Sequence, residues 1–382
     1  MEVKFKKGTS ENCDPVEAIR EMATQIGSPE PSVTALFISS HYDLESIGQQ
    51  IRKQFQGPVI CCTTSGEITS DGYKNHSISG FSLGGDVISV STYPITNIRN
   101  LNPGSVQQTI ESIKKQIQYG RQYFPERDFF GVLLIDGLSV REELIAATFG
   151  NALSDIPIIG GSAGDDLKFE KCCIMTGDTF ETDTALFCLF STSLPFAIVK
   201  SQHFSATDKR LVITRAKPNE RIVEEINGVK AVDEYSRITG IPREQIGPEI
   251  FSRYPLILRH SKDIHVRSIQ KINSNGSLTF YCAIDEGVVL RVAERIDMCN
   301  ELEQCLMQAE KTVGRVLFTL GFDCILRRLE SREFNYDDRI RALFNKFNVI
   351  GFSTYGEQSN SLHVNQTFSG VVMGDIPDEF RQ

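Results

Sequence analysis

Three short stretches of the sequence combine a hydroxyl group, a glycine and a carboxylate directly after an apolar run. The glycine lets the backbone turn with a positive φ or approach a ligand closely. The hydroxyl can hold the turn or a ligand, and the acid can accept hydrogen bonds or orient a cation. We therefore take the matching positions as candidate ligand-binding residues: Thr64, Gly66, Glu67, Ser162, Gly164, Asp165, Thr354, Gly356 and Glu357.

The same residue types also occur in turns that bind nothing. Thr, Gly and Asp are common at the end of a strand, because they support tight turns and local hydrogen bonds. Three copies in one chain favour a site, but duplication of a fold element would produce them as well. The sequence leaves the ligand-binding and the structural interpretation open.

The first of these stretches follows a segment that reads as strand, helix and strand. An apolar run from Ser32 predicts a strand, and the next residues repeat apolar side chains at helical spacing. Asp43 is the expected N-cap of this helix, and Gly57-Pro58 ends it. The second strand begins at Val59 and leads into the motif.

The two other stretches follow similar segments. In the second, a strand begins at Phe129 and a helix follows it. Ser139 and Glu142 have the spacing of a capping box at the start of this helix. In the third, a strand from Arg315 precedes a longer crossover with a helix over 338–347. Such connections favour parallel strands, so we expect all three motifs at the carboxyl ends of strands, where ligands bind in open α/β sheets.

The middle of the chain has a different pattern. Turn residues at Asn227-Gly228, at 273–276 and at 285–287 separate short alternating runs, which predicts an antiparallel meander with hairpins. A helix from Ala231 should stop at Gly240. We therefore expect an α/β protein of two domains with mixed sheets, built around strand–helix–strand units, with the meander in its C-terminal part.

Composition excludes several functional classes. The net charge of −9 argues against nucleic-acid binding, which depends on neutralising phosphates. We expect a cytoplasmic protein, because we find neither a secretory signal nor an apolar run long enough to span a membrane. The ten cysteines, with no C-x-x-C pair, then read as reduced thiols and not as disulfides or metal ligands.

The sequence also lacks the motifs of common enzymes. We find no nucleophile elbow, no phosphate loop, no zinc-ligand spacing and no dinucleotide fingerprint. We therefore expect no catalytic activity. The remote alternative is an enzyme that uses Cys62 or Cys324 as its nucleophile, although no base is evident beside either.

Five blocks of the chain resemble FIST-domain proteins: CCTTSGEI, GGSAGDD, NGVKAVDEY, DCILRRLE and GFSTYGEQ. The resemblance implies an N-terminal extension over 1–31, a FIST N-terminal sensory domain over 32–228 and a FIST C-terminal domain over 229–382. It also implies a non-catalytic module that binds a small ligand, such as an amino acid or another metabolite, and signals to a partner.

Other blocks resemble stand-alone bacterial members described as haem-binding nitric-oxide sensors: IVKSQHF, HVRSIQKINSNGSLTFYCAIDEGVVL, FDCILRRLE and GFSTYGEQ with HVNQTFSG. This likeness implies non-covalently bound haem b. It also implies a separate histidine kinase or cyclic-di-GMP enzyme as the partner. We also consider self-association.

Three histidines lie in those blocks, and each could bind ferrous iron through a neutral ring nitrogen. We place His203 first, because it follows an apolar strand that could line a haem pocket, then His363 and His265. At most one or two would be ligands, and ligation by Tyr281 or Cys282 stays open.

Two adjacent arginines, Arg327 and Arg328, complete the candidates. An arginine can hold a ligand carboxylate, including a haem propionate, through two parallel hydrogen bonds. The alternative is that both arginines and Glu330 form the solvated face of a helix. The sequence supports both interpretations equally.

Overall fold

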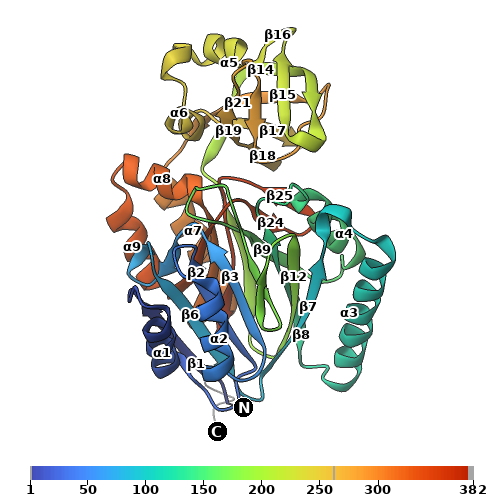
Figure 1. Ribbon diagram of the computed structural model, residues 1–382, viewed down its shortest axis with the longest axis vertical. Coiled ribbons are helices and arrows are strands. Elements are labelled where there is room, and N and C mark those ends of the chain that lie inside the picture. The colour runs from blue at the N-terminus through green and yellow to red at the C-terminus, as the bar shows by residue number, and fades with distance from the viewer. Residues whose placement is uncertain (1, 261–262, 377–382) are drawn as a thin grey trace.

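The computed structural model describes residues 2–260 and 263–376. Three α/β repeats form the lower body in Figure 1, and an antiparallel unit lies above them. In each repeat an edge strand and a helix precede a strand–helix–strand unit, which is followed by a short hairpin and a last strand. The predicted mixed α/β class and the predicted antiparallel meander are confirmed.

The elements of the repeats follow one plan. The first has β1 (Lys4–Ser10), α1 (Pro15–Ile26), β2 (Val33–Ser39), α2 (Leu44–Gln54), β3 (Val59–Thr64), β4 (Glu67–Thr69), β5 (Gly72–Lys74) and β6 (Ile78–Gly84). The second has β7 (Ile88–Thr96), α3 (Pro103–Tyr123), β8 (Asp128–Asp136), α4 (Glu142–Ala152), β9 (Ile158–Ala163), β10 (Ile174–Thr176), β11 (Thr179–Glu181) and β12 (Thr184–Thr192). The third has β13 (Phe196–Ser201), α7 (Met298–Val313), β22 (Val316–Cys324), α8 (Ile325–Glu333), α9 (Asp337–Lys346), β23 (Val349–Thr354), β24 (Glu357–Ser359), β25 (Leu362–Val364) and β26 (Phe368–Gly374).

The strands of each repeat also pair in one order. The orders are β1-β6-β2-β3, β7-β12-β8-β9 and β13-β26-β22-β23. The two strands joined by a helical crossover are parallel in all three cases, as the sequence predicted. A further shared feature is a positive φ just before the last strand, at His76 (52°), Asp183 (54°) and Gln366 (49°). The three units are therefore structural repeats and not merely similar in pattern.

Each sheet is completed by a hairpin from a different repeat. The hairpin β4–β5 pairs with β23 of the third repeat, where Glu67 lies opposite Phe352. The hairpin β10–β11 pairs with β3 of the first repeat, and β24–β25 pairs with β9 of the second. This cyclic exchange ties the repeats together and brings the residues before each hairpin to the centre of the body.

The antiparallel unit is inserted in the third repeat, between β13 and α7. It contains β14 (Phe204–Lys217), β15 (Ile222–Ile226), β16 (Val229–Lys230), α5 (Ala231–Thr239), α6 (Pro248–Arg253), β17 (Leu256–His260), β18 (Asp263–Arg267), β19 (Ile269–Ile272), β20 (Leu278–Phe280) and β21 (Val289–Arg295). Single-turn helices cover 98–100, 218–220 and 243–245. The proposed domain boundary at 228 falls inside this unit, at the turn between β15 and β16.

The body and the inserted unit have separate cores. Phe37, Phe130 and Phe322 come from the three sheets and belong to one shared core of the body. Leu211, Tyr235 and other residues of the inserted unit form their own core beneath α5 and α6. Further buried clusters lie beneath the helices of the body and beside β17 and β21, which agrees with a chain too long for one simple core.

Several local predictions are confirmed. Asp43 caps α2, because its side chain accepts a hydrogen bond from the Ser46 N–H at 3.2 Å. Gly240 ends α5 in the left-handed conformation with φ 78°. Asn227 and Gly228 both have positive φ in the turn that precedes β16.

Two local predictions are wrong. Ser139 and Glu142 form no capping box, because α4 begins at Glu142 itself and Arg141 is its N-cap residue. Residues 285–287 join no hairpin, because β21 pairs with β14 and β17 while β20 pairs with β15 and β19. The third crossover also contains α8 (Ile325–Glu333), the helix that the alternative interpretation of Arg327, Arg328 and Glu330 implied.

Candidate ligand-binding sites

The three sequence motifs lie at the carboxyl ends of β3, β9 and β23, as predicted. We call them turn 1 (residues 64–67), turn 2 (162–165) and turn 3 (354–357). Backbone hydrogen bonds join them in a ring: turn 1 bonds to Ser353 beside turn 3, turn 2 bonds to Thr63 beside turn 1, and turn 3 bonds to turn 2. The structure therefore brings the three motifs together.

The acids of turns 1 and 3 bind the chain itself. Glu67 accepts hydrogen bonds from the hydroxyl of Thr64 at 2.5 Å and from the hydroxyl of Ser77 at 2.6 Å. Glu357 repeats this arrangement with Thr354 and Thr367. We call each arrangement a carboxyl clasp, because it fastens a turn to the start of the repeat's last strand.

Both clasp carboxyls are fully buried. Burial raises the pKa of Glu67 to about 7 and the pKa of Glu357 to about 8, although the hydroxyl hydrogen bonds oppose this shift. These acids therefore hold the fold in the described structure and have little capacity left for a ligand.

Turn 2 uses its acid differently. Asp165 accepts the backbone N–H groups of Phe169, Glu170 and Lys171 at 2.7–3.0 Å and the hydroxyl of Tyr355 from turn 3. Burial raises its pKa, but these hydrogen bonds outweigh burial and lower it overall. Asp165 thus stays ionised, shapes the loop that follows turn 2 and links that loop to turn 3.

The glycines allow protein groups, not a ligand, to approach the turns in this structure. Gly66 has φ 117°, and an added Cβ would lie 1.5 Å from a guanidinium nitrogen of Arg328. At Gly164 the nearest atom would be the Ser65 hydroxyl at 2.1 Å, and at Gly356 it would be His363 Cε1 at 2.3 Å. Protein side chains therefore take the close positions that we expected for a ligand.

Arg328 fills the space beside turn 1. Its guanidinium donates to the carbonyl of Ser65 at 3.0 Å, the carbonyl of Lys74 at 2.8 Å and the side-chain oxygen of Asn75 at 2.7 Å. The residue is buried at the start of α8. The interpretation of Arg327, Arg328 and Glu330 as a solvated face is wrong, because all three side chains are buried.

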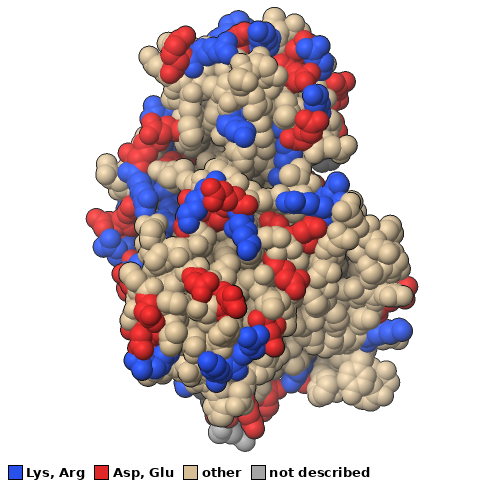
Figure 2. Space-filling view, in the orientation of Figure 1, with Lys and Arg blue, Asp and Glu red and all other residues tan. Residues whose placement is uncertain are grey.

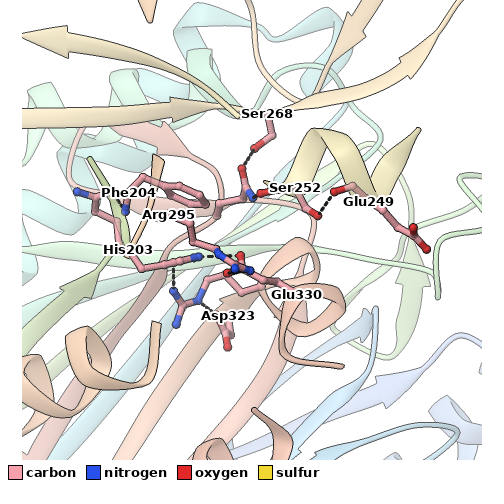
Figure 3. Close-up of polar contacts among 11 residues, drawn as sticks. His203, Phe204, Glu249, Ser252, Ser268, Arg295, Asp323 and Glu330 are labelled. Atoms are coloured by element: carbon pink, nitrogen blue, oxygen red, sulfur yellow. Dashed lines mark hydrogen bonds and ion pairs between the residues drawn. The ribbon is translucent and has the colours of Figure 1, made fainter. Parts of the chain in front are cut away.

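Arg327 belongs to a buried polar network that connects α8 to the inserted unit. Figure 3 labels its other members, His203, Arg295, Asp323 and Glu330. It donates from Nε to Asp323 at 2.6 Å and from Nη1 to Nδ1 of His203 at 2.8 Å. An arginine can only donate, so Nδ1 accepts and the Nε2–H of His203 donates to Glu330 at 2.7 Å. Glu330 also accepts from Arg295 of the inserted unit at 3.4 Å.

His203 therefore does not fit an axial haem ligand in this arrangement. Both of its ring nitrogens are engaged, and burial lowers its pKa and keeps it neutral. The sequence favours His203 because it follows an apolar strand. The sequence could not show that Arg327 and Glu330, far along the chain, would occupy both nitrogens.

His363 has a different environment. Its Nδ1 lies 3.3 Å from the amide nitrogen of Gln358, whereas its Nε2 has no hydrogen-bond partner within the described residues. The side-chain amide of Asn365 is buried and likewise unpartnered among those residues. This ring offers a nitrogen, but it packs against Gly356, so a porphyrin would require the hairpin β24–β25 to open.

The remaining haem candidates lie in the inserted unit. His265 is on β18, opposite Leu258 of β17. Tyr281 and Cys282 follow β20 and are buried, and burial raises the pKa of Cys282 to about 11. The four cavities that we describe below are lined by none of the three histidines within the described residues.

One cavity contains a sequence-predicted residue. We call it the α2 cleft; it measures about 450 Å³ and lies between the N-terminus of α2 and the loop after turn 2. Its lining consists of Ser40, Tyr42, Asp43, Leu44, Glu45, Thr63, Asp165, Lys168, Glu170 and Lys171. It therefore lies at the carboxyl ends of β2 and β3, the edge at which we expected a ligand.

The sequence analysis identified Asp165, which lines this cleft, but it did not identify the loop after Asp165, which also lines it. The signal was available in the repeats: β4 starts one residue after Gly66, whereas β10 starts ten residues after Gly164. The second repeat therefore carries an inserted loop. Asp166 in that loop accepts hydrogen bonds from Ser39 at 3.0 Å and Ser40 at 2.8 Å, which fasten it to the end of β2.

Three other cavities lie elsewhere. The first cavity measures about 660 Å³ and lies between the inserted unit and α8. It is lined by Gln245, Gly247, Pro248, Glu249, Ser252, Leu329, Arg332 and Glu333. One of about 340 Å³ lies between β1 and β4 and is lined by Lys7, Gly8, Thr9, Gln25, Thr69, Ser70, Asp71, Asn345 and Ile350. The last, on the inserted unit, contains Arg210, Arg259, Val289 and Arg291.

The cysteines proposed as nucleophiles are poorly suited to that role. Cys62 and Cys324 are buried, and burial raises the pKa of each thiol well above its ordinary value. A thiol rather than a thiolate is a weak nucleophile.

No helix within residues 2–260 and 263–376 is long and apolar enough to cross a membrane.

Comparison with known proteins adds the family. A model described as the FIST N domain matches residues 32–229, and a model described as the FIST C domain matches residues 231–360. The chain is also similar to an uncharacterized protein of Methanocaldococcus jannaschii, with 24% identity over 293 residues. This match covers 66% of the chain and 56% of the relative, so the chain spans little more than half of that relative's length.

Proposed function

This chain belongs to the FIST family, and on that premise we propose that it is a cytoplasmic sensory protein whose small ligand enters the α2 cleft. FIST domains are generally small-ligand sensory domains and not catalytic ones. The metabolite is a compact polar molecule, because charged side chains of both signs line the cleft.

One observation carries this proposal. Turns 1 and 3 are filled by side chains of the protein itself, Arg328 and His363, whereas turn 2 borders an open cavity of small-molecule size. The repeats provide the same strand-end position three times. Among the residues that the structure describes, the position beside turn 2 borders such a cavity.

The cleft is also connected to the rest of the body. Asp165 accepts both from the loop that lines the cleft and from Tyr355 of turn 3. A ligand that moves this loop would change the hydrogen bond to Tyr355 and thereby bias two arrangements of the turns. The coupling needs no long pathway, because turns 1, 2 and 3 are joined by backbone hydrogen bonds.

A thermal-shift screen with small polar metabolites tests the proposal. Compounds that bind the native state raise the unfolding temperature. The variant Glu45→Trp fills the cleft and should abolish the shift, whereas Lys53→Trp, at the exposed far end of the same helix, should keep it. Equal shifts in both variants would place the ligand elsewhere.

The second candidate is a haem-based nitric-oxide sensor. The observation that favours it is Nε2 of His363, which has no hydrogen-bond partner in the described part of the chain. Haem would supply a site for a diatomic gas on its iron. Titration of wild type, His363→Ala and His203→Ala with haem tests this candidate: only His363→Ala should lose the Soret shift, and unchanged spectra in both variants would reject the assignment.

The partner is part of the proposal as well. We propose that the protein regulates a separate histidine kinase or cyclic-di-GMP enzyme, and that it self-associates. Co-purification with such enzymes should change with ligand. Recovery of no signalling enzyme in the presence or absence of ligand would contradict this partner.

A further inference from the structure

The outer face of the inserted unit carries arginines on neighbouring strands. Arg210 of β14 lies directly opposite Arg291 of β21 in the antiparallel register. Arg259 lies on β17, which pairs with the other edge of β21. We call the surface formed by Arg210, Arg259, Val289 and Arg291 the arginine face.

The arginine face is hollow. These four residues line a cavity of about 440 Å³, within the size range of sites for small molecules. Val289 is 48% exposed and lies opposite Val212, which is 37% exposed. The face therefore combines guanidinium groups with an exposed apolar pair, and the core of the unit lies on the opposite side of these strands, at Leu211 and Leu290.

The facing charges of Arg210 and Arg291 oppose stability in the absence of a ligand. Like charges directly opposite each other on neighbouring strands are destabilising. Arg291 donates a hydrogen bond from Nη1 to the carbonyl of Thr207 at 2.9 Å. Its ion-pair partner Asp208 lies at 3.7 Å on a fully exposed side chain, and such ion pairs contribute little. On the face of the molecule shown in Figure 2 basic and acidic side chains are mixed, and the chain as a whole has a net charge of −9.

We propose that the arginine face binds a small molecule with two or more phosphate charges. A guanidinium group matches phosphate oxygens through two parallel hydrogen bonds and stays ionised at all relevant pH values. An anion between Arg210 and Arg291 would attract both guanidinium groups and so offset the repulsion between them. The valine pair can contact an apolar ring, so the ligand is either a nucleotide or a polyphosphate without a base.

This site is independent of the α2 cleft. The arginine face belongs to the inserted unit, whereas the cleft belongs to the first and second repeats. Two separate sites would let the protein respond to two molecules. A negative result at one site would not contradict the proposal for the other site.

Calorimetric titration with ADP, pyrophosphate and adenosine at constant ionic strength tests the arginine face. We expect ADP and pyrophosphate to bind and adenosine not to bind. Tighter binding of ADP would identify a nucleotide, and equal binding would identify the phosphate anion alone as the ligand. No binding of either anion would overturn the proposal.

The variants Arg210→Gln and Arg243→Gln sharpen the test. Arg210→Gln should weaken binding about tenfold or more, since it removes charge-assisted hydrogen bonds. It should also leave the unfolding temperature of the ligand-free protein unchanged or higher, because one repulsion is gone. Arg243 pairs with Asp233 in the same unit, so Arg243→Gln should bind normally. A less stable Arg210→Gln with full affinity would show a structural arginine and contradict the proposal.

Discussion

At the scale of single residues, the carboxyl clasps make stability depend on pH. The pKa of Glu67 is about 7 and that of Glu357 about 8 in the folded chain, above the ordinary value of 4.5. The folded state therefore holds these protons where the unfolded state has released them. The free energy of unfolding should consequently fall as pH rises from about 4.5 to 8, by roughly 2 kcal/mol or more for each clasp.

Urea unfolding of wild type and of Glu67→Gln across this range measures the effect. Glutamine resembles the protonated acid, so the variant should lose the contribution of one clasp to the pH slope. Buried His203 and His363 have lowered pKa values, which make stability rise with pH. The difference between wild type and variant isolates the clasp, and parallel pH profiles would contradict it.

Gly66 provides a second prediction about one residue. In Gly66→Ala the new methyl group would meet Arg328 at 1.5 Å, and φ is 117°. We expect the free energy of unfolding to fall by about 3 kcal/mol or more. Gly177→Ala is the matched control, because its φ is 58° but nothing lies within 4 Å; it should cost about 1 kcal/mol. Similar losses at both glycines would mean that Arg328 is not held against turn 1.

At the scale of elements, α8 joins the inserted unit to the turns. Arg327 connects Asp323 to His203, and its removal would leave buried groups without their partner. Arg327→Met should therefore lower the free energy of unfolding by about 3–5 kcal/mol. Arg332→Met, on the exposed side of the same helix, should change it by less than about 0.5 kcal/mol. Urea unfolding measures both, and a small loss for Arg327→Met would contradict the network.

The elements that the sequence predicted well are those in which apolar residues recur at regular spacing. The strand from Val33 and α2 follow from apolar spacing and from Asp43 as the N-cap. The short strands β4, β10 and β24 have no such period, and their partners lie in other repeats, so the cyclic exchange of hairpins could not be predicted.

The candidate site was predicted in part. The three turns were found from their hydroxyl, glycine and acid, and the structure brings them together. Their roles could not be predicted, because the partners are distant in sequence: Arg328 fills the space at Gly66, and Tyr355 reaches Asp165. A carboxylate in a turn looks the same in sequence whether it binds a ligand or a neighbouring hydroxyl.

At the scale of the whole molecule, Arg221 fastens the inserted unit to the body. Its guanidinium lies 2.6 Å from carboxylates of Glu142 and Glu143 at the start of α4, and the side chain is only 8% exposed. Arg221→Gln should loosen the inserted unit and speed limited proteolysis within residues 204–295. Arg215→Gln removes exposed ion pairs within the unit and should digest at the wild-type rate. Equal digestion rates would show that Arg221 does not hold the unit.

Native mass spectrometry can detect a small molecule bound in the α2 cleft. Wild type, Glu45→Trp and Lys53→Trp are each equilibrated with a cytosolic small-molecule extract and freed of unbound compounds. The account predicts the same added mass on wild type and Lys53→Trp and none on Glu45→Trp, whose tryptophan occupies the cleft. An added mass that persists on Glu45→Trp, or none on wild type, would contradict the account.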